Sequence, residues 1–390
     1  MRPFTFALTL SLLVAPVAVQ AACGGSFQSF VQDMKTEAVQ KGHDKATVNQ
    51  FFASVRQSQS VLRADRNQGM FQRPFIDFSN NLISDARLKK GQRLGREYDA
   101  VFDEIDRRYG ISRGVLIAFW AFETAYGTYQ GDFNTANALV TLAHDCRRPD
   151  LFRPHVFAAI KLYENGDFDP RTTTGAWAGE IGMLQKLPRD ILESGVDGDG
   201  DGHVRLKTSA PDALLSGAAM LSKFGWRAGQ PWLQEVTVPA NLDWSQSGIH
   251  VAKPTKQWAA QGVSARSGSL PKNLNASLIL PQGHKGPAFL VYPNFNVYFD
   301  WNQSFTYVVT AAYFATLVEG APKMNKGSPD KGLTGDQMIA LQRKLKDRGY
   351  NVGKVDGILG ANTRLAVQKE QKRLGLPADA WPTVPLLNAL

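Results

Sequence analysis

One carboxylate stands out because of the residues around it. Glu123 follows the apolar and aromatic run 116–122, and Gly127 ends the helix that this run predicts. A carboxylate in such surroundings is costly to keep charged, so burial should raise its pKa and hold a proton on it near neutral pH. A protonated carboxyl can donate to a substrate, but buried carboxylates also serve in structural ion pairs. From the residues alone, both roles of Glu123 stay open.

A second group of acidic residues has the spacing of a cation site. Residues 197–203 read Asp-Gly-Asp-Gly-Asp-Gly-His, which matches the first half of an EF-hand loop. Oxygens would come from the side chains of Asp197, Asp199 and Asp201 and from the backbone of His203. The second half departs, because Thr208 stands where a bidentate glutamate is expected. We favour a structural calcium ion over a plain solvated turn.

The other reactive side chains do not form a recognisable site. Ser112 lies in a G-x-S-x-G pattern, but that nucleophile motif needs a preceding strand, and a charged helix is predicted there. We therefore expect Ser112 to be a helix cap. The six histidines lack the H-E-x-x-H spacing of zinc enzymes. The net charge of +9 suits an anionic partner, yet no Lys/Arg-rich block favours nucleic acid.

The N-terminus predicts export. Arg2 precedes an apolar stretch over residues 4–19, and residues 19–21 fit a cleavage site with a small last residue. Residues 1–21 are therefore predicted to be a secretory signal peptide, which would place the mature protein in the periplasm. No later stretch is long and apolar enough to cross a bilayer.

The chain has two cysteines, Cys23 and Cys146. In an exported protein, two cysteines predict one disulfide, which would tie the N-terminus to the domain. Cys23 could instead carry a lipid anchor just after the cleavage site. Lipoprotein sites usually have leucine where Gln20 stands, so we favour the disulfide.

Apolar periodicity predicts a mainly α protein. Helices are expected within 27–60, Leu94–Tyr109, Val115–Phe122, His155–Tyr163, Pro211–Phe224 and Tyr307–Leu317. From about 236 to 300, Gly, Pro and β-branched residues rise and aromatic residues alternate through Phe289–Phe299, which predicts a small β-rich part. Residues 321–332 have the composition of a linker, and residues 333–390 form a compact helical unit.

The stretch Glu123-Thr124-Ala125-Tyr126-Gly127 resembles the E-T-x-x-G catalytic motif of the membrane-bound lytic transglycosylase B family. Further pieces follow in the family's order, so the resemblance covers Phe27 to about Val318. These pieces are Asp65-Arg66-Asn67-Gln68, Gly179-x-x-Gly182-x-x-Gln185-x-x-Pro188, the acidic loop and Trp301-Asn302-Gln303-Ser304. The resemblance implies a lysozyme-like α domain with a small β-rich subdomain over residues 22–320. Residues 333–390 resemble the peptidoglycan-binding domain 1 family, a three-helix module.

The family's chemistry needs only one carboxyl. As the resemblance implies, Glu123 would protonate the oxygen between N-acetylmuramic acid and N-acetylglucosamine in peptidoglycan. It would then take a proton from the muramoyl C6 hydroxyl, which attacks C1 and leaves a 1,6-anhydromuramic acid end. Ordinary glycosidases need a second carboxyl, whose place this internal hydroxyl takes. No cofactor is required, and we expect a monomer whose partners are glycan strands and cell-wall assembly proteins.

The resemblance also assigns binding residues. Gln185, Trp301, Asn302 and Tyr307 match positions that contact substrate in the family. Trp301 stands where the family often has tyrosine and could still stack on a sugar ring. Asp212 matches a later aspartate that closes the family's cation loop.

Two departures from the family's pattern fall in the segment before Gln185. Ala176 replaces a substrate-contacting serine, and Glu180 replaces a small residue. Glu180 could be a second acid that permits hydrolysis, although we favour an ion-pair partner. The alternatives to a transglycosylase are therefore a hydrolytic muramidase and a non-catalytic wall-binding scaffold.

Overall fold

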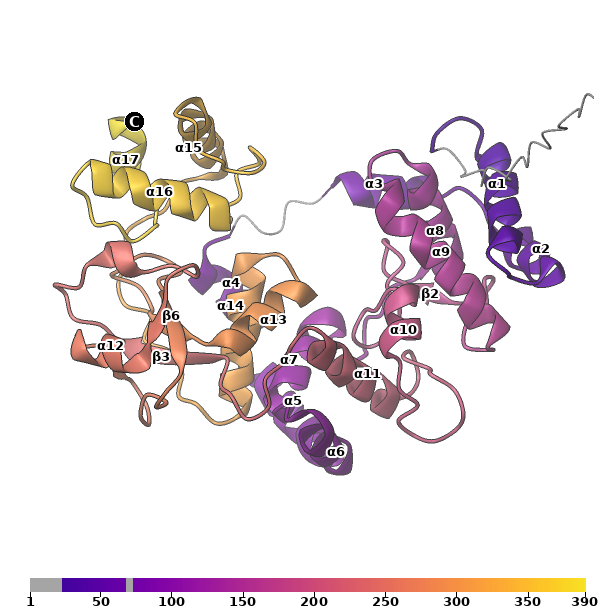
Figure 1. The fold of residues 1–390 in the computed structure, drawn as a ribbon, viewed down its shortest axis with the longest axis horizontal. Helices are drawn as coiled ribbons and strands as arrows, with labels where there is room; N and C mark the ends of the chain where they lie inside the picture. The colour runs from indigo at the N-terminus through magenta and orange to yellow at the C-terminus, as the bar shows by residue number, and fades with distance from the viewer. Residues whose placement is uncertain (1–22, 68–72) are drawn as a thin grey trace, which may run out of the picture.

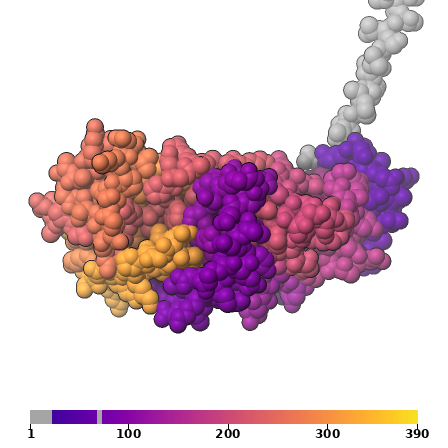
Figure 2. All heavy atoms as spheres, turned by 90° about the horizontal axis from the view of Figure 1, so that it is seen from below, coloured from indigo at the N-terminus to yellow at the C-terminus, as the bar shows by residue number. Residues whose placement is uncertain are grey.

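The computed structural model describes residues 23–67 and 73–390, so the predicted signal peptide at 1–21 and Gln68 lie outside the described residues. The described residues form seventeen α-helices and a small five-stranded sheet, which confirms the predicted mainly α class. In Figure 1, helices of the N-terminal half form one end of an elongated molecule, and the sheet and the C-terminal helices form the other. Seen from below, the purple atoms of the segment after residue 73 lie across the middle (Figure 2). No helix in this part of the chain has the length and hydropathy needed to cross a bilayer.

The N-terminal end of the molecule is a lobe of six helices. They are α1 (Phe27–Gln40), α2 (Lys45–Ala53), α3 (Gln59–Arg66), α8 (Thr135–His144), α9 (Pro149–Glu164) and α10 (Pro188–Ser194). Side chains of Ser26, Asp44 and Ser58 cap the first three helices by accepting backbone N–H groups. The apolar faces, including Met34 and Phe51, meet in one core.

A second group of helices forms the middle of the molecule. They are α4 (Phe75–Leu82), α5 (Asp85–Glu97), α6 (Asp99–Tyr109), α7 (Arg113–Thr124), α11 (Ala210–Lys223), α13 (Pro293–Trp301) and α14 (Phe305–Val318). Helix α7 is apolar on nearly every side, so it lies buried within this group and packs most extensively against α14. This placement puts Glu123, in the last turn of α7, at the centre of the fold.

The predicted helix over Leu94–Tyr109 is not continuous. Its residues fall in α5 and α6, because Tyr98 leaves helical geometry with φ −104° and ψ 31°. The Tyr98 ring packs edge-on against Trp120 of α7, with ring centroids 5.7 Å apart. Ser112 is the N-cap residue of α7, as predicted, but its hydroxyl donates to Glu319. The Glu319 carboxylate also accepts the Gly114 N–H at 2.7 Å, which complements the positive end of the helix.

The β-rich part is an antiparallel sheet with the strand order β4-β6-β7-β3-β5. The strands are β3 (Leu233–Thr237), β4 (Ala252–Pro254), β5 (Ser264–Ala265), β6 (Asn275–Ile279) and β7 (Phe289–Val291), with the short helix α12 (Thr255–Ala260) between β4 and β5. The pairing of β1 (Phe133–Asn134) with β2 (Thr174–Gly175) lies apart from this sheet. The predicted alternation through Phe299 is wrong after residue 291. Pro293 is the first residue of α13, a position that suits a residue without a backbone N–H.

The C-terminal unit contains three helices, as predicted. They are α15 (Gly335–Asp347), α16 (Ala361–Arg373) and α17 (Val384–Ala389), and a capping box of Thr334 and Gln337 begins the first. The residues before it form no helix or strand but lie against the protein. The Met324 side chain is buried, and Trp381 Nε1 donates to the Asp330 carbonyl at 2.9 Å.

Polar side chains dock this module onto the sheet end of the molecule. The buried Gln368 amide donates to the carbonyls of Trp244 and Ser247 at 3.2 and 2.9 Å. Asp379 accepts hydrogen bonds from both the backbone and the ring of His284. Because buried donors and acceptors need partners, these contacts hold the module in one orientation.

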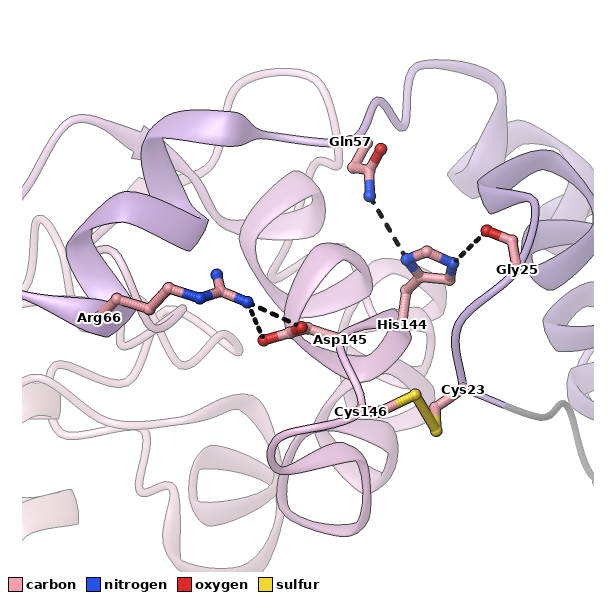
Figure 3. The surroundings of a disulfide bond; sticks show 7 residues. All are labelled: Cys23, Gly25, Gln57, Arg66, His144, Asp145 and Cys146. Atoms are coloured by element: carbon pink, nitrogen blue, oxygen red, sulfur yellow. Dashed lines mark hydrogen bonds and ion pairs between the residues drawn. A yellow bond between two sulfur atoms is a disulfide. The ribbon is translucent and has the colours of Figure 1, made fainter.

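A disulfide joins Cys23 to Cys146, which confirms the predicted pairing (Figure 3). It closes a loop with a sequence separation of 123 residues, and so removes much conformational freedom from the unfolded chain. Nearby, the two ring nitrogens of His144 face Gln57 and the Gly25 carbonyl. The N-terminal residues are thereby tied to the end of α8.

Candidate active site

The chain turns sharply just after Glu123. Helix α7 ends at Thr124, and the next three residues, Ala125, Tyr126 and Gly127, have positive φ values of 50°, 63° and 79°. Left-handed geometry is uncommon for residues other than glycine and clusters at functional sites. The Thr124 hydroxyl donates to the Met183 carbonyl at 2.7 Å and accepts the Gly127 N–H at 2.9 Å. These bonds attach the end of α7 to the segment around Met183.

Two donors from other helices hold one oxygen of Glu123. The Tyr307 hydroxyl, in the first turn of α14, donates to Oε1 at 2.5 Å. Trp301 Nε1, at the end of α13, donates to the same oxygen at 3.0 Å. Within residues 23–67 and 73–390, no hydrogen bond reaches Oε2. A proton on the carboxyl therefore belongs on Oε2, because Oε1 already accepts two hydrogen bonds.

The electrostatics of the carboxyl agree with the prediction from the sequence. Burial raises the pKa of Glu123, and the opposing effects of Tyr307, Trp301 and a nearby lysine, Lys186, do not cancel this rise. Burial also raises the pKa of Tyr307 well above its usual value, and the Glu123 charge adds to this. Tyr307 therefore remains a protonated phenol and stays a donor. The Glu123 side chain is partly exposed, so its proton is not sealed from a substrate.

Trp301 offers no free face for stacking on a sugar ring, because both faces of the indole are covered, and its role in substrate binding stays a prediction. The Phe119 ring stacks on one face with a centroid distance of 4.0 Å and an interplanar angle of 15°. The Lys186 ammonium lies 2.8 Å from the ring centroid, too close to share a side with Phe119. The indole thus acts through its edge, which donates to Glu123.

The other two predicted binding residues lie outside the helices and strands, next in sequence to Trp301 and Lys186. Asn302 follows α13, and its Oδ1 accepts the Ser304 N–H at 2.9 Å. Gln185 lies two residues after Met183, in left-handed geometry with φ 52°. Its amide donates to the carbonyls of Gly182 and Gln130 at 2.8 and 3.3 Å. Gln185 is thus a turn residue, and its role in substrate binding stays a prediction.

Comparison with known proteins identifies the family to which this site belongs. Residues 26–316, most of the chain, match the family model described as the transglycosylase SLT domain. The chain belongs to this family. Residues 334–390 of the transglycosylase match the peptidoglycan binding domain model.

Individual relatives agree with this family. Structures of SltB3 from Pseudomonas aeruginosa, in complex with NAG-anhNAM-pentapeptide or NAG-NAM-pentapeptide, have 36% sequence identity to the chain and a TM-score of 0.86. The first of them is matched over 94% of this chain and 99% of that one. Membrane-bound lytic murein transglycosylase B of Escherichia coli is 24% identical over 73% of this chain and 82% of its own length. The protein is a peptidoglycan lytic transglycosylase.

Lys186 is the residue of this transglycosylase site that sequence reasoning missed. It directly follows Gln185 in the matched motif, but a lysine in a loop is normally solvated, so nothing local indicated burial. In the structure only 5% of it is exposed. The one signal for Lys186 in the sequence was its position directly after Gln185, a predicted substrate-binding residue.

Glu180 does not form the ion pair that we favoured from the sequence. Its Oε2 is buried without a hydrogen-bond partner, and no ion pair to it occurs in the described ranges. Burial raises the pKa of Glu180, and the charge of Glu123 raises it further. Arg148 acts on Glu180 electrostatically but pairs with Asp65. Glu180 is therefore a second carboxyl near Glu123, and its surroundings favour the protonated form of Glu180.

The acidic loop gathers three of its predicted ligands. Side-chain oxygens of Asp197, Asp199 and Asp212 lie within 4.8 Å of one another. Asp212 is buried, and its two oxygens accept the backbone N–H groups of Gly198 and Arg205 at 2.9 and 2.7 Å. Three carboxylates this close repel one another unless a cation or protons intervene, and oxygens are the ligands that calcium prefers. The residues present therefore fit a calcium ion.

The side chains of Asp201 and His203, the other two predicted ligands, contact other residues instead of this cluster. Asp201 pairs with Arg205 at 2.7 Å, and the His203 ring contacts Asp167 at 2.8 Å. His203 was expected to contribute only its backbone carbonyl, so its part in the loop stays a prediction. The side chain of Asp201 lies outside the cluster of three carboxylates.

Proposed function

We propose that Glu123 is both the acid and the base with which this transglycosylase cleaves peptidoglycan glycan strands. The observation that carries the proposal is the pair of donors on Oε1, which leaves Oε2 to carry the reacting proton. The presence of NAG-anhNAM-pentapeptide in the related SltB3 structure supports strands of these two sugars as the substrate class.

Cleavage begins with proton donation. Oε2 gives its proton to the oxygen that joins N-acetylmuramic acid to N-acetylglucosamine, and the bond from C1 to this oxygen breaks. Its electron pair leaves with the departing sugar. Glu123 becomes ionised, and the hydrogen bonds from Tyr307 and Trp301 strengthen because charge-assisted bonds are stronger than neutral ones.

Ring closure returns the enzyme to its starting state. The C6 hydroxyl of the same N-acetylmuramic acid forms a bond to C1, and its proton passes to Oε2. The product ends in a 1,6-anhydro ring, and no water is consumed. The attacking hydroxyl is already held near C1 by the sugar itself, so proximity replaces a second carboxyl.

Residues 333–390 would keep the enzyme on the cell wall, and we place that activity in the periplasm. The peptidoglycan binding match supports the first point. The predicted signal peptide and the Cys23–Cys146 disulfide support the second, because disulfides persist in oxidising compartments. A sulfur bonded to Cys146 is also not free to carry a lipid, which argues against an anchor at Cys23.

We also propose that Asp197, Asp199 and Asp212 hold a structural calcium ion. An E. coli Slt35 structure in complex with calcium shares this fold, with a TM-score of 0.64 and 24% identity. The ion would tie the acidic loop to the first turn of α11, where Asp212 lies. It would supply charge neutralisation there and take no part in bond cleavage.

The test of the proposed function is Glu123→Gln, measured by mass spectrometry of the muropeptides that the purified enzyme releases from peptidoglycan. We expect turnover to fall by about two to four orders of magnitude, as for the loss of a general acid, while wall binding stays intact. Glu97→Gln, at an exposed carboxylate of α5, is the control and should keep full activity. Full activity of Glu123→Gln, or wild-type products with reducing ends, would contradict the proposal.

A further inference from the structure

Lys186 is a buried cation beside the proposed catalytic carboxyl, and the mechanism above gives it no role. The backbone holds it in place, because Ile181 and Lys186 exchange both of their N–H to carbonyl hydrogen bonds at 2.8 and 2.9 Å. Helix α10 begins two residues later at Pro188. Lys186 therefore lies on a short hairpin whose backbone hydrogen bonds fix it in its buried position.

The Lys186 side chain reaches Glu123 through one intervening ring. Its ammonium lies over one face of Trp301, and the edge of the same indole donates to Glu123 Oε1. A cation over an indole face is attracted to it and makes the edge N–H a better donor. Phe119 supports the opposite face, so the indole cannot tilt away from either group.

Other charged or titratable groups also face this pair. Asp190 of α10 acts on Lys186, and Glu180 of the same hairpin faces Glu123. Tyr307 of α14 donates to Glu123, and Arg148 lies near Glu180 but pairs with Asp65. Lys186 is thus the cation whose charge acts directly on Glu123 in this group.

We propose that Lys186 is a positioning residue, whose ammonium stabilises the ionised form of Glu123 between its two proton transfers and orients the Trp301 donor. This inference rests on the proposed role of Glu123. When Glu123 has protonated the leaving oxygen, the nearby ammonium attracts the new carboxylate charge. When Glu123 is neutral, the ammonium attracts it less strongly. The stabilisation by Lys186 is therefore largest after the first proton transfer, when Glu123 is ionised.

The burial of Lys186 suits this role. Burial lowers the pKa of Lys186 to about 7, and the Glu123 charge acts in the opposite direction. The charge of Lys186 is therefore sensitive to the state of its neighbour near neutral pH. Two groups that interact this closely lose their protons as a pair.

The test measures the protonation of Glu123 directly. Enzyme labelled with ¹³C at the glutamate side-chain carboxyl is titrated by NMR, and the Glu123 signal is assigned by its loss in Glu123→Gln. In Lys186→Met, which keeps the unbranched shape of the side chain but lacks its terminal ammonium, the Glu123 pKa should rise by about 1 to 3 pH units, the range expected from losing a nearby opposite charge. The alkaline limb of the turnover profile should move the same way. Lys186→Arg should stay near the wild type, as should Lys256→Met at an exposed lysine of α12.

An unchanged Glu123 titration in Lys186→Met would overturn the proposal, as would an equal rise in Lys186→Arg. If Lys186→Met does not fold, Lys186→Gln is titrated in its place under the same criteria. The titration needs no turnover, so its outcome is separate from that of the proposed function. If Glu123→Gln stays active while the Glu123 titration shifts in Lys186→Met, the catalytic role of Glu123 is refuted and the electrostatic role of Lys186 is not.

Discussion

Replacing Tyr307 with phenylalanine tests the hydrogen bond that depends most on the ionisation of Glu123. The bond spans 2.5 Å from a buried phenol to Oε1. A hydrogen bond to a charged group contributes about 1.5 to 3 kcal/mol, more than one to a neutral group. The bond already exists to the neutral carboxyl, at about 0.5 to 1.5 kcal/mol, so only the gain on ionisation, about 1 to 1.5 kcal/mol, raises the barrier when the bond is lost. Since about 1.36 kcal/mol is tenfold in rate, turnover should fall about 5- to 15-fold.

The assay is the rate at which anhydro-muropeptides are released from purified peptidoglycan at saturating substrate. Tyr313→Phe is the matched control, because Tyr313 lies on the same helix and its hydroxyl accepts the Met324 N–H at 3.0 Å, away from Glu123. It should lose about 1 kcal/mol of stability and no turnover. Both variants are compared at a temperature below the midpoint of their unfolding.

The pH profile supplies a second readout for Tyr307→Phe. The hydrogen bond lowers the pKa of Glu123, so its removal should move the alkaline limb upward by about 1 pH unit. A decrease in turnover of less than about threefold with an unmoved alkaline limb would refute the assignment of Oε1 as the oxygen held by the enzyme. An equal loss in Tyr313→Phe would show that the effect is only structural.

Two further predictions concern stability. Burial raises the pKa of Glu180 above its usual 4.5, so the stabilising effect of its proton is complete below pH 4.5 and is lost as pH rises through the folded pKa. Glu180→Gln should therefore raise the melting temperature at pH 7 but not at pH 4, and calorimetry showing no gain at pH 7 would refute this. Calcium at a hundredfold excess over its Kd should stabilise the wild type by about 2.7 kcal/mol. Asp199→Ala should abolish that gain, and turnover should not respond to calcium; a gain that survives in Asp199→Ala would place the ion elsewhere.

The features that could be found from the sequence depend on short stretches of chain. The E-T-x-x-G motif, the acidic loop and the cap at Ser112 each lie within a few residues, so local spacing was enough to find them. The errors arose where distant residues decide the outcome. Tyr98 interrupts the predicted helix and packs on Trp120, and Pro293 starts a helix where aromatic residues had suggested a strand.

Glu180 and Lys186 illustrate the same limit within the site. Both are charged residues in a loop segment, and such residues are mostly solvated or paired. Their burial follows from the tight hairpin between Gly175 and Pro188, whose geometry depends on what packs around it. A sequence pattern could mark them as unusual but could not assign their surroundings.

The sequence by itself determined that Glu123 ends an apolar helix, and hence that its carboxyl would be buried and inclined to keep its proton. Only the tertiary structure decided which carboxyl oxygen accepts the hydrogen bonds of Tyr307 and Trp301, and therefore which oxygen is left to carry the proton. The reason is distance along the chain: the two donors lie 178 and 184 residues from Glu123. Their directions are set by the packing of α13 and α14 against α7, and that packing is a property of the whole core.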